Sequence, residues 1–129
     1  MKSGAHIRNA VAGIALAAAF FWAPGVLARA TPESLPEIAA ADLPREGLEV
    51  LVLIHEGGPF RYDRDGVVFG NYERLLPAER KGYYHEYTVR TPGAKNRGAR
   101  RIICGGPAKS PVACFYTGDH YRSFKRIHE

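Results

Sequence analysis

The feature that most constrains the fold is a series of short strand-like segments that follows one helix-like segment. These segments are rich in aromatic and β-branched residues, which pack well on a pleated sheet. Turn residues separate them, as at Asp65-Gly66 and Thr91-Pro92-Gly93. One helix followed by strands joined by turns is typical of an α+β fold, in which an antiparallel sheet packs on the helix. The expected strands are residues 67–69, 83–91, 101–104, 112–116 and 121–127.

The expected helix begins near Leu43 and ends at Gly57-Gly58-Pro59. Pro44 suits the first helical position, and Asp42 is a candidate N-cap. Because residues 50–54 are all apolar, this segment could instead be a buried strand, and the pattern leaves that alternative open. The residues at helical spacing that favour a helix are Leu48, Leu51, Val52 and His55.

The first 30 residues have the features of a secretory signal peptide. Lys2 and Arg8 make the beginning positive, residues 11–21 are apolar apart from one glycine, and Ala28-Arg29-Ala30 resembles a cleavage site. The apolar run is short for a membrane span, which needs about 20 residues, so a retained anchor is the less favoured alternative. Cleavage after Ala30 would release residues 31–129 as one secreted domain without membrane contact. Residues 31–42 are expected to form a loosely held arm at its beginning.

Charge gives only local evidence about a partner. The chain has 18 Lys and Arg against 13 Asp and Glu, and the leader holds three of the basic residues and none of the acidic ones. The remaining domain is therefore only weakly basic, with 15 basic residues against 13 acidic ones. The close spacing of Arg97, Arg100 and Arg101 is a better indication of an anionic ligand.

The chain has two cysteines, Cys104 and Cys114. In an exported protein they are expected to form a disulfide that joins two strands across a hairpin loop. A catalytic cysteine is the less favoured alternative, because neither residue has an evident paired base in the sequence. The histidines and cysteines lack the spacing of a metal site, so we expect no metal and no other cofactor.

Strand alternation predicts which side chains share a face of the sheet. Tyr87 and Val89 lie on the more apolar face of their strand, which should pack on the helix. Glu86 then points to the opposite, open face. If Ile102 also faces the helix, Arg101 points to the same side as Glu86, so that a carboxylate and a guanidinium would share the open face.

Five further motifs lie one after another in the segment from about residue 43 to residue 127. They are Phe69-Gly70-Asn71-Tyr72-Glu73, Gly82-Tyr83-Tyr84-His85-Glu86-Tyr87-Thr88-Val89, Thr91-Pro92-Gly93-Ala94, Arg97-Gly98 and Tyr116-Thr117-Gly118-Asp119-His120-Tyr121. Together they resemble the secreted guanyl-specific ribonucleases of bacteria, above all those of streptomycetes and more distantly the barnase-like enzymes. The resemblance implies the microbial ribonuclease fold, with one main helix packed on a curved antiparallel sheet of about five strands.

The resemblance also implies roles for individual residues. Glu86 matches the general base and His120 the general acid of the family, while Arg97 and Arg101 match the arginines that hold the phosphate. Residues 69–73 match the loop that recognises guanine, in which a buried Glu73 would accept hydrogen bonds from the base. The expected substrate-binding residues are Phe69, Asn71, Tyr72, Glu73, Tyr121 and Arg100.

The implied activity is metal-independent cleavage of single-stranded RNA after guanosine, through a 2′,3′-cyclic phosphate. RNA supplies its own 2′-hydroxyl nucleophile, so the enzyme needs only a base and an acid on opposite sides of the phosphorus. The alternatives are a secreted RNA-binding module, which should lack Glu86 or His120, and an interbacterial toxin with the same chemistry. The expected partners are single-stranded RNA and a barstar-like inhibitor, and the family suggests a monomer.

The chain departs from its close relatives in three respects. Lys95 stands where arginine can occur, at the rim of the site. Gly70 and Tyr72 replace longer polar residues that are usual in the guanine loop. Cys104 and Cys114 would join a hairpin, whereas the disulfide of the streptomycete enzymes ties their termini. These differences concern base selection and stability more than the chemistry of cleavage.

Overall fold

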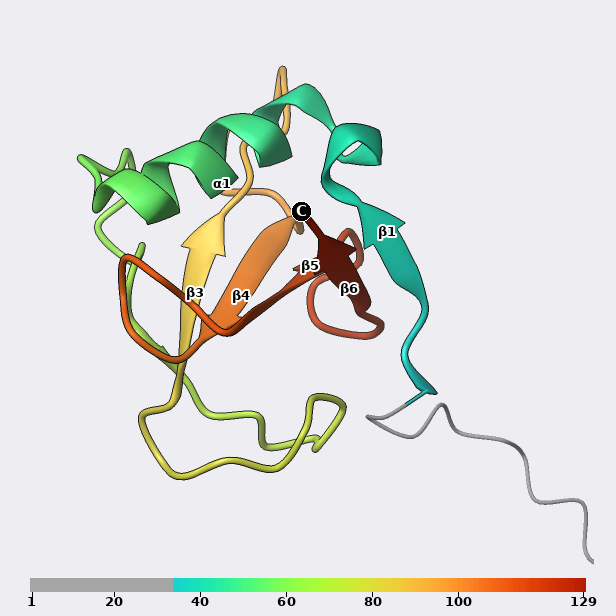
Figure 1. Ribbon diagram of the computed structural model, residues 1–129. Helices are drawn as coiled ribbons and strands as arrows, with labels where there is room; N and C mark the ends of the chain where they lie inside the picture. Colours follow the sequence, from blue (N-terminus) through green and yellow to red (C-terminus); the bar gives the residue numbers. More distant parts are fainter. Residues whose placement is uncertain (1–33) are drawn as a thin grey trace, which may run out of the picture.

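The computed structural model describes residues 34–129, in which one helix packs on a six-stranded sheet (Figure 1). The expected signal peptide and its cleavage site lie outside the described residues. Within residues 34–129, no helix is both long enough and apolar enough to cross a membrane. The elements are β1 (Glu37–Ala39), the 3₁₀ turn η2 (Ala40–Asp42), α1 (Arg45–Glu56), β2 (Val68–Phe69), β3 (Tyr84–Thr88), β4 (Arg101–Gly105), β5 (Ala113–Thr117) and β6 (Lys125–His128).

The expected α+β class is confirmed, and the sheet has one strand more than the five expected. Its order is β1-β6-β5-β4-β3-β2. The pairs from β2 to β6 are antiparallel, whereas β1 pairs with β6 in parallel and places Ile38 opposite Ile127. The expectation of a loose arm is therefore wrong for residues 37–42. A strand of three residues is too short to show an alternating pattern, so its partner β6 determines its conformation.

Residues 50–54, which could also have formed a strand, lie in the helix α1. The helix begins slightly later than the expected start near Leu43. Pro44 is the N-cap and makes no side-chain cap bond, while Asp42 lies in the preceding 3₁₀ turn. Gly57 ends the helix in the left-handed conformation, with φ of 83°. The buried face contains Leu51 and Ile54, whereas Val52 is 55% exposed. An all-apolar run cannot indicate which side of the helix faces the sheet, so the exposure of Val52 could not be predicted from the sequence.

Apolar clusters cover both faces of the sheet. On the helix side, α1 packs on side chains from β3 and β4 that include Tyr87 and Ile102, as predicted. The opposite face is also covered, because Leu76 and Phe124 pack there against β-strand side chains. Glu86 points to this second face as expected, but it is only 4% exposed. The face that was expected to be open is therefore partly closed around the carboxylate.

The predicted disulfide between Cys104 and Cys114 is present. The two cysteines lie directly opposite each other on β4 and β5, and both belong to the core beneath α1. The bond therefore joins two central strands of the sheet across their connecting loop.

Candidate active site

A row of buried polar residues crosses three strands at one end of the sheet. Thr88 ends β3, Arg101 begins β4 and Thr117 ends β5, and the register places each beside the next. All three are at most 3% exposed. Each strand thus delivers one polar anchor to the same place, beside Glu86 on β3.

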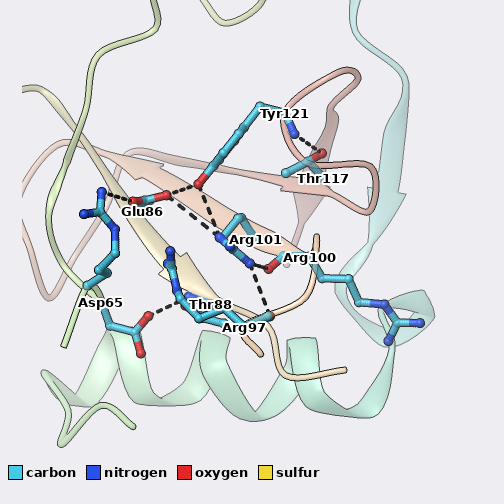
Figure 2. Close-up of polar contacts among 9 residues, drawn as sticks. Asp65, Glu86, Thr88, Arg97, Arg100, Arg101, Thr117 and Tyr121 are labelled. Carbon is cyan, nitrogen blue, oxygen red and sulfur yellow. Dashed lines mark hydrogen bonds and ion pairs between the residues drawn. The ribbon is translucent and has the colours of Figure 1, made fainter. Parts of the chain in front are cut away.

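Glu86 lies between two guanidinium groups and one phenol. Its Oε1 is 3.4 Å from Nη2 of Arg64, and its Oε2 is 4.0 Å from Nε of Arg101. The Tyr121 hydroxyl donates a hydrogen bond to Oε2. Figure 2 shows the side chains of Glu86, Arg101 and Tyr121 converging on one point. Two nearby positive charges compensate the cost of burying a carboxylate.

The two arginines predicted to hold the phosphate are fixed by different partners. Arg101 donates from Nη1 to the carbonyl oxygen of Arg100 at 2.7 Å and from Nε to the Tyr121 hydroxyl at 3.2 Å. Arg97 donates from Nε to Oγ1 of Thr88 at 2.9 Å. Among the side chains of residues 34–129, Nη2 of Arg97 is the one buried polar atom without a hydrogen-bond partner. A buried donor without a partner carries a desolvation cost that an anionic ligand would relieve.

His120 lies in a tight turn after β5. Both His120 and Tyr121 have positive φ, at 57° and 72°. The amide of His120 donates to the carbonyl oxygen of Ala99 at 2.9 Å, and the amide of Tyr121 donates to Oγ1 of Thr117 at 3.1 Å. These bonds fix a strained backbone and leave the imidazole exposed, with its ring centroid 5.0 Å from that of Tyr121.

Asp119 braces the same turn. It accepts hydrogen bonds from the Thr117 hydroxyl at 2.9 Å and from the Ser123 amide and hydroxyl at 2.9 and 2.5 Å. Desolvation raises the pKa of Asp119, but these hydrogen bonds outweigh it and lower the pKa below its usual value. The carboxylate therefore favours its charged form, which makes it a strong acceptor.

Tyr121 is kept in its neutral, donating form. Burial raises its pKa, and the hydrogen bond to Glu86 raises it further. At neutral pH the phenol is protonated and can donate to Glu86, while it accepts from Arg101. Tyr121 is thus the link between the carboxylate and the guanidinium of the site.

A cavity of about 650 Å³ unites most of the predicted site residues. Arg101 lies behind its wall, in contact with both Glu86 and Tyr121. Arg100 does not join the site, because its guanidinium points away from Glu86 in Figure 2. The predicted residues that line the cavity are Phe69, Asn71, Tyr72, Glu73, Glu86, His120 and Tyr121.

The loop at residues 69–73, which was predicted to recognise guanine and is called the recognition loop below, has a fixed backbone and one exposed carboxylate. Asn71 has φ of 50° and bonds to both the amide and the carbonyl of Leu76, at 3.1 and 3.0 Å, so its side chain holds the loop together. The Phe69 ring stacks on that of Tyr121 with centroids 5.2 Å apart. Glu73 is exposed, and the expectation that it is buried is wrong for the protein without ligand.

Sequence reasoning missed Arg64, Asp65 and Thr117 as supports of the site. Asp65 accepts from the backbone amides of Thr88 and Tyr62, at 2.7 and 3.1 Å, and so fixes the turn that carries Arg64. The Asp65-Gly66 turn was evident in the sequence, but its pairing with Glu86 depends on tertiary register. In the described part of the chain, no group of three His, Cys, Asp or Glu residues is arranged to hold a metal ion.

The fold and this cavity place the chain in a known class. A family model described as ribonuclease matches residues 28–128, and the chain belongs to the ribonuclease family. Its relatives include the guanyl-specific ribonucleases Sa3 and Sa of Kitasatospora aureofaciens. Each is 51% identical, over 98 and 90 residues, or 76% and 70% of this chain and 67% and 91% of the relative.

Solved structures of ribonuclease Sa2 are also similar. One, from a study of its complexes with mononucleotides, has a TM-score of 0.69 at 42% identity and covers 74% of this chain and 95% of that one. Another, of ribonuclease Sa2 with guanosine-2′-cyclophosphate, has a TM-score of 0.66 at 42% identity and covers 73% and 96%. The resemblance to guanyl-specific ribonucleases and the microbial ribonuclease fold are therefore both confirmed.

Proposed function

We propose that this protein is an endoribonuclease that cleaves single-stranded RNA on the 3′ side of guanosine through a 2′,3′-cyclic phosphate. The observation that carries this proposal is the meeting of Glu86 and His120 on one cavity with the recognition loop. The relatives' names and the guanosine-2′-cyclophosphate in the ribonuclease Sa2 structure support the same reaction. The presence of both Glu86 and His120 disfavours a non-catalytic RNA-binding module.

In the first step, the ribose 2′-oxygen forms a bond to phosphorus while the bond to the leaving 5′-oxygen breaks. Glu86 takes the proton from the 2′-hydroxyl, and His120 gives a proton to the leaving 5′-oxygen. The guanidiniums of Arg97 and Arg101 stabilise the negative charge that develops on the phosphoryl oxygens. Arg97 does not line the cavity, but its Nη2 is a buried donor without a partner, and its Nε bonds to Thr88, two residues from Glu86 on β3.

In the second step, water opens the cyclic phosphate to a 3′-phosphate. The two groups exchange roles, so that His120 takes a proton from water and Glu86 returns one to the 2′-oxygen. Tyr121 keeps Glu86 aligned in both steps through its hydrogen bond. All the required groups come from the protein, the RNA and water.

Guanine would be recognised by the loop at residues 69–73. Phe69 offers a ring for stacking, backbone amides near Asn71 would reach the O6 atom, and Glu73 would accept from N1 and N2. Since Glu73 is exposed without a ligand, guanine itself would cover this carboxylate. A base without the paired donors would leave a covered acceptor unpaired, and this cost would give the selectivity.

We propose further that residues 1–30 direct secretion and are cleaved after Ala30. The mature domain, residues 31–129, would act as a monomer on single-stranded RNA. A barstar-like inhibitor would block it by covering the cavity that holds Glu86 and His120. A cognate inhibitor would favour the toxin role over general RNA degradation.

The reaction is tested with the dinucleotides GpC and CpG. We expect GpC to give guanosine 2′,3′-cyclic phosphate first and 3′-GMP later, as mass spectrometry of timed samples would show. We expect CpG to stay intact over the same period. Direct appearance of 3′-GMP without the cyclic phosphate, or equal cleavage of CpG, would contradict the proposal.

A further inference from the structure

A second cavity, of about 970 Å³, adjoins the active-site cavity. The two share Arg64 and residues 68–72 as a wall, but the second contains neither Glu86 nor His120. The far side of the second cavity is the segment 78–82, which leads into β3. The recognition loop therefore has a hollow on each side, and the proposed chemistry uses only one of them.

The charge of the second cavity suits a polyanion. Four cationic side chains line it, Arg64, Arg74, Arg80 and Lys81, against one acidic side chain, Glu79. Within residues 34–129, four of these five side chains are exposed and form no ion pair within 4.0 Å. They are Arg74, Glu79, Arg80 and Lys81. The phosphates of RNA are the ligands that such a cluster attracts.

An aromatic ring stands between the two cavities. Tyr72 lines both of them and is 91% exposed. Its ring lies over Gly70, where an added Cβ would come within 2.5 Å of two ring atoms. The glycine thus permits the position of the tyrosine, so that the two departures from the usual loop sequence form one unit. Bases of single-stranded RNA stack on exposed rings of this kind.

The direction of the RNA chain follows from the chemistry. Our proposed function places His120 at the leaving 5′-oxygen, so the nucleotides 3′ of the cut depart on the side of His120. His120, Tyr121 and Arg122 line only the first cavity. The second cavity is left for the part of the RNA on the other side of the guanosine.

From these observations we propose that the second cavity is a subsite for the nucleotide on the 5′ side of the guanosine. The base of this nucleotide stacks on Tyr72, and the phosphate that joins it to the guanosine contacts the cations of the segment 78–82. The proposal rests on the proposed function for its polarity. The subsite would bind RNA outside the catalytic residues, and it would favour substrates that extend on the 5′ side of the guanosine.

The test compares three substrates, GpC, ApGpC and GpCpA, with a double variant, Arg80→Gln/Lys81→Gln. We expect the variant to lower kcat/KM for ApGpC by roughly 5- to 20-fold and to leave GpC and GpCpA unchanged. For ApGpC, the slope of log kcat/KM against log salt concentration should become shallower by about 0.7 for each phosphate that the variant no longer neutralises. Arg64 and Tyr72 are not substituted, because they also border the catalytic cavity.

The matched control is Arg45→Gln/Lys109→Gln, which removes the same charge from two exposed sites outside both cavities. We expect this control to treat all three substrates as the wild type does. An equal loss for ApGpC in both double variants would show long-range charge alone and would overturn the subsite. A loss confined to GpCpA, or no loss at all, would also overturn it.

A binding measurement separates this subsite from the proposed function. Calorimetric titration with 2′-deoxyguanosine versions of GpC and ApGpC, which lack the nucleophile, gives the affinity ratio without cleavage. We expect the wild type to favour the longer ligand and Arg80→Gln/Lys81→Gln to lose that preference. If the wild type favours the longer ligand but does not cleave GpC, the result would count against the proposed function and not against the subsite. Equal affinities in the wild type would overturn the subsite.

Discussion

The carboxylate of Glu86 is stable in its buried position because its neighbours compensate its charge and fill its hydrogen-bonding capacity. Arg64 and Arg101 approach it from two sides, and Tyr121 donates to it. The same contacts aim the carboxylate into the cavity. Stability and catalysis at Glu86 therefore depend on the same side chains. The two effects are separated by comparing a Glu86 variant with a variant of His120, which is exposed.

We predict that Glu86→Gln lowers kcat for GpC by roughly 10²- to 10⁴-fold, the usual contribution of a general base. It should also lower the free energy of unfolding by about 1–3 kcal/mol, because the two guanidiniums lose their counter-charge. Dinucleotide kinetics and urea unfolding measure the two effects. Wild-type turnover in this variant would remove Glu86 from the role of base.

His120→Gln is the companion variant. His120 is exposed, and its backbone amide makes the bond to Ala99 that a glutamine would keep. We expect a comparable loss of kcat with a change in unfolding free energy within about 0.5 kcal/mol. A large loss of stability together with the loss of activity would show that the histidine supports the turn and not the proton transfer.

Thr117 is a positioning residue in this account. Its hydroxyl donates to Asp119 and accepts from the Tyr121 amide, so it holds the turn that presents His120. We predict that Thr117→Val lowers kcat about 10-fold with a cost of about 1–3 kcal/mol in stability, since the hydrogen bonds to Asp119 and from the Tyr121 amide are both lost. Thr117→Ser keeps the hydroxyl and should recover most of the kcat. No rescue by serine would refute the hydrogen-bonding role.

At the level of elements, the sequence predicted what alternation and turn residues determine. The strand containing Glu86 and the faces of Tyr87, Ile102 and Arg101 follow from a period of two. β1 escaped prediction because it is three residues long and takes its conformation from β6. The burial of Glu86 also escaped prediction, since its neighbours Arg64 and Tyr121 lie far from it in the sequence and meet it only in the folded chain.

The pairing of β4 with β5 carries the disulfide prediction. Reduction opens a short loop between Cys104 and Cys114, which are 10 residues apart, and should cost a little under about 3 kcal/mol of stability. We expect dithiothreitol to lower the melting temperature and to leave GpC cleavage intact below the transition. The Glu86 and His120 contacts involve neither cysteine. A complete loss of activity in the reduced, folded protein would contradict this separation of core and site.

For the whole molecule, buried tyrosines predict sensitivity to alkali. Burial raises the pKa of Tyr84 from 10.0 to about 12, and burial also raises the pKa of Tyr87, Tyr116 and Tyr121. A raised native pKa stabilises the fold fully below the unfolded value of about 10, and this stabilisation is lost as pH rises towards the native value. For Tyr84 alone the shift in pKa corresponds to about 2–3 kcal/mol.

Urea unfolding of the wild type and Tyr84→Phe between about pH 8 and pH 11 tests this directly. The variant should be less stable at the lower pH, because it loses the 2.6 Å bond from the hydroxyl to the Pro77 carbonyl oxygen. It should then lose less stability than the wild type as pH rises above about 10. Parallel stability curves for the two proteins would show that Tyr84 contributes nothing to the alkaline transition.

The measurement that tests the central claim most directly uses refolded residues 31–129, EDTA and an RNA oligonucleotide that contains a single guanosine. Mass spectrometry identifies the product ends, with the Glu86→Gln protein as the control for contaminating nucleases. We predict a single cut 3′ of the guanosine, an initial 2′,3′-cyclic phosphate and no comparable cleavage by the variant. Cleavage at every base would contradict the recognition loop, and an intact oligonucleotide with a folded wild-type protein would contradict the catalytic site.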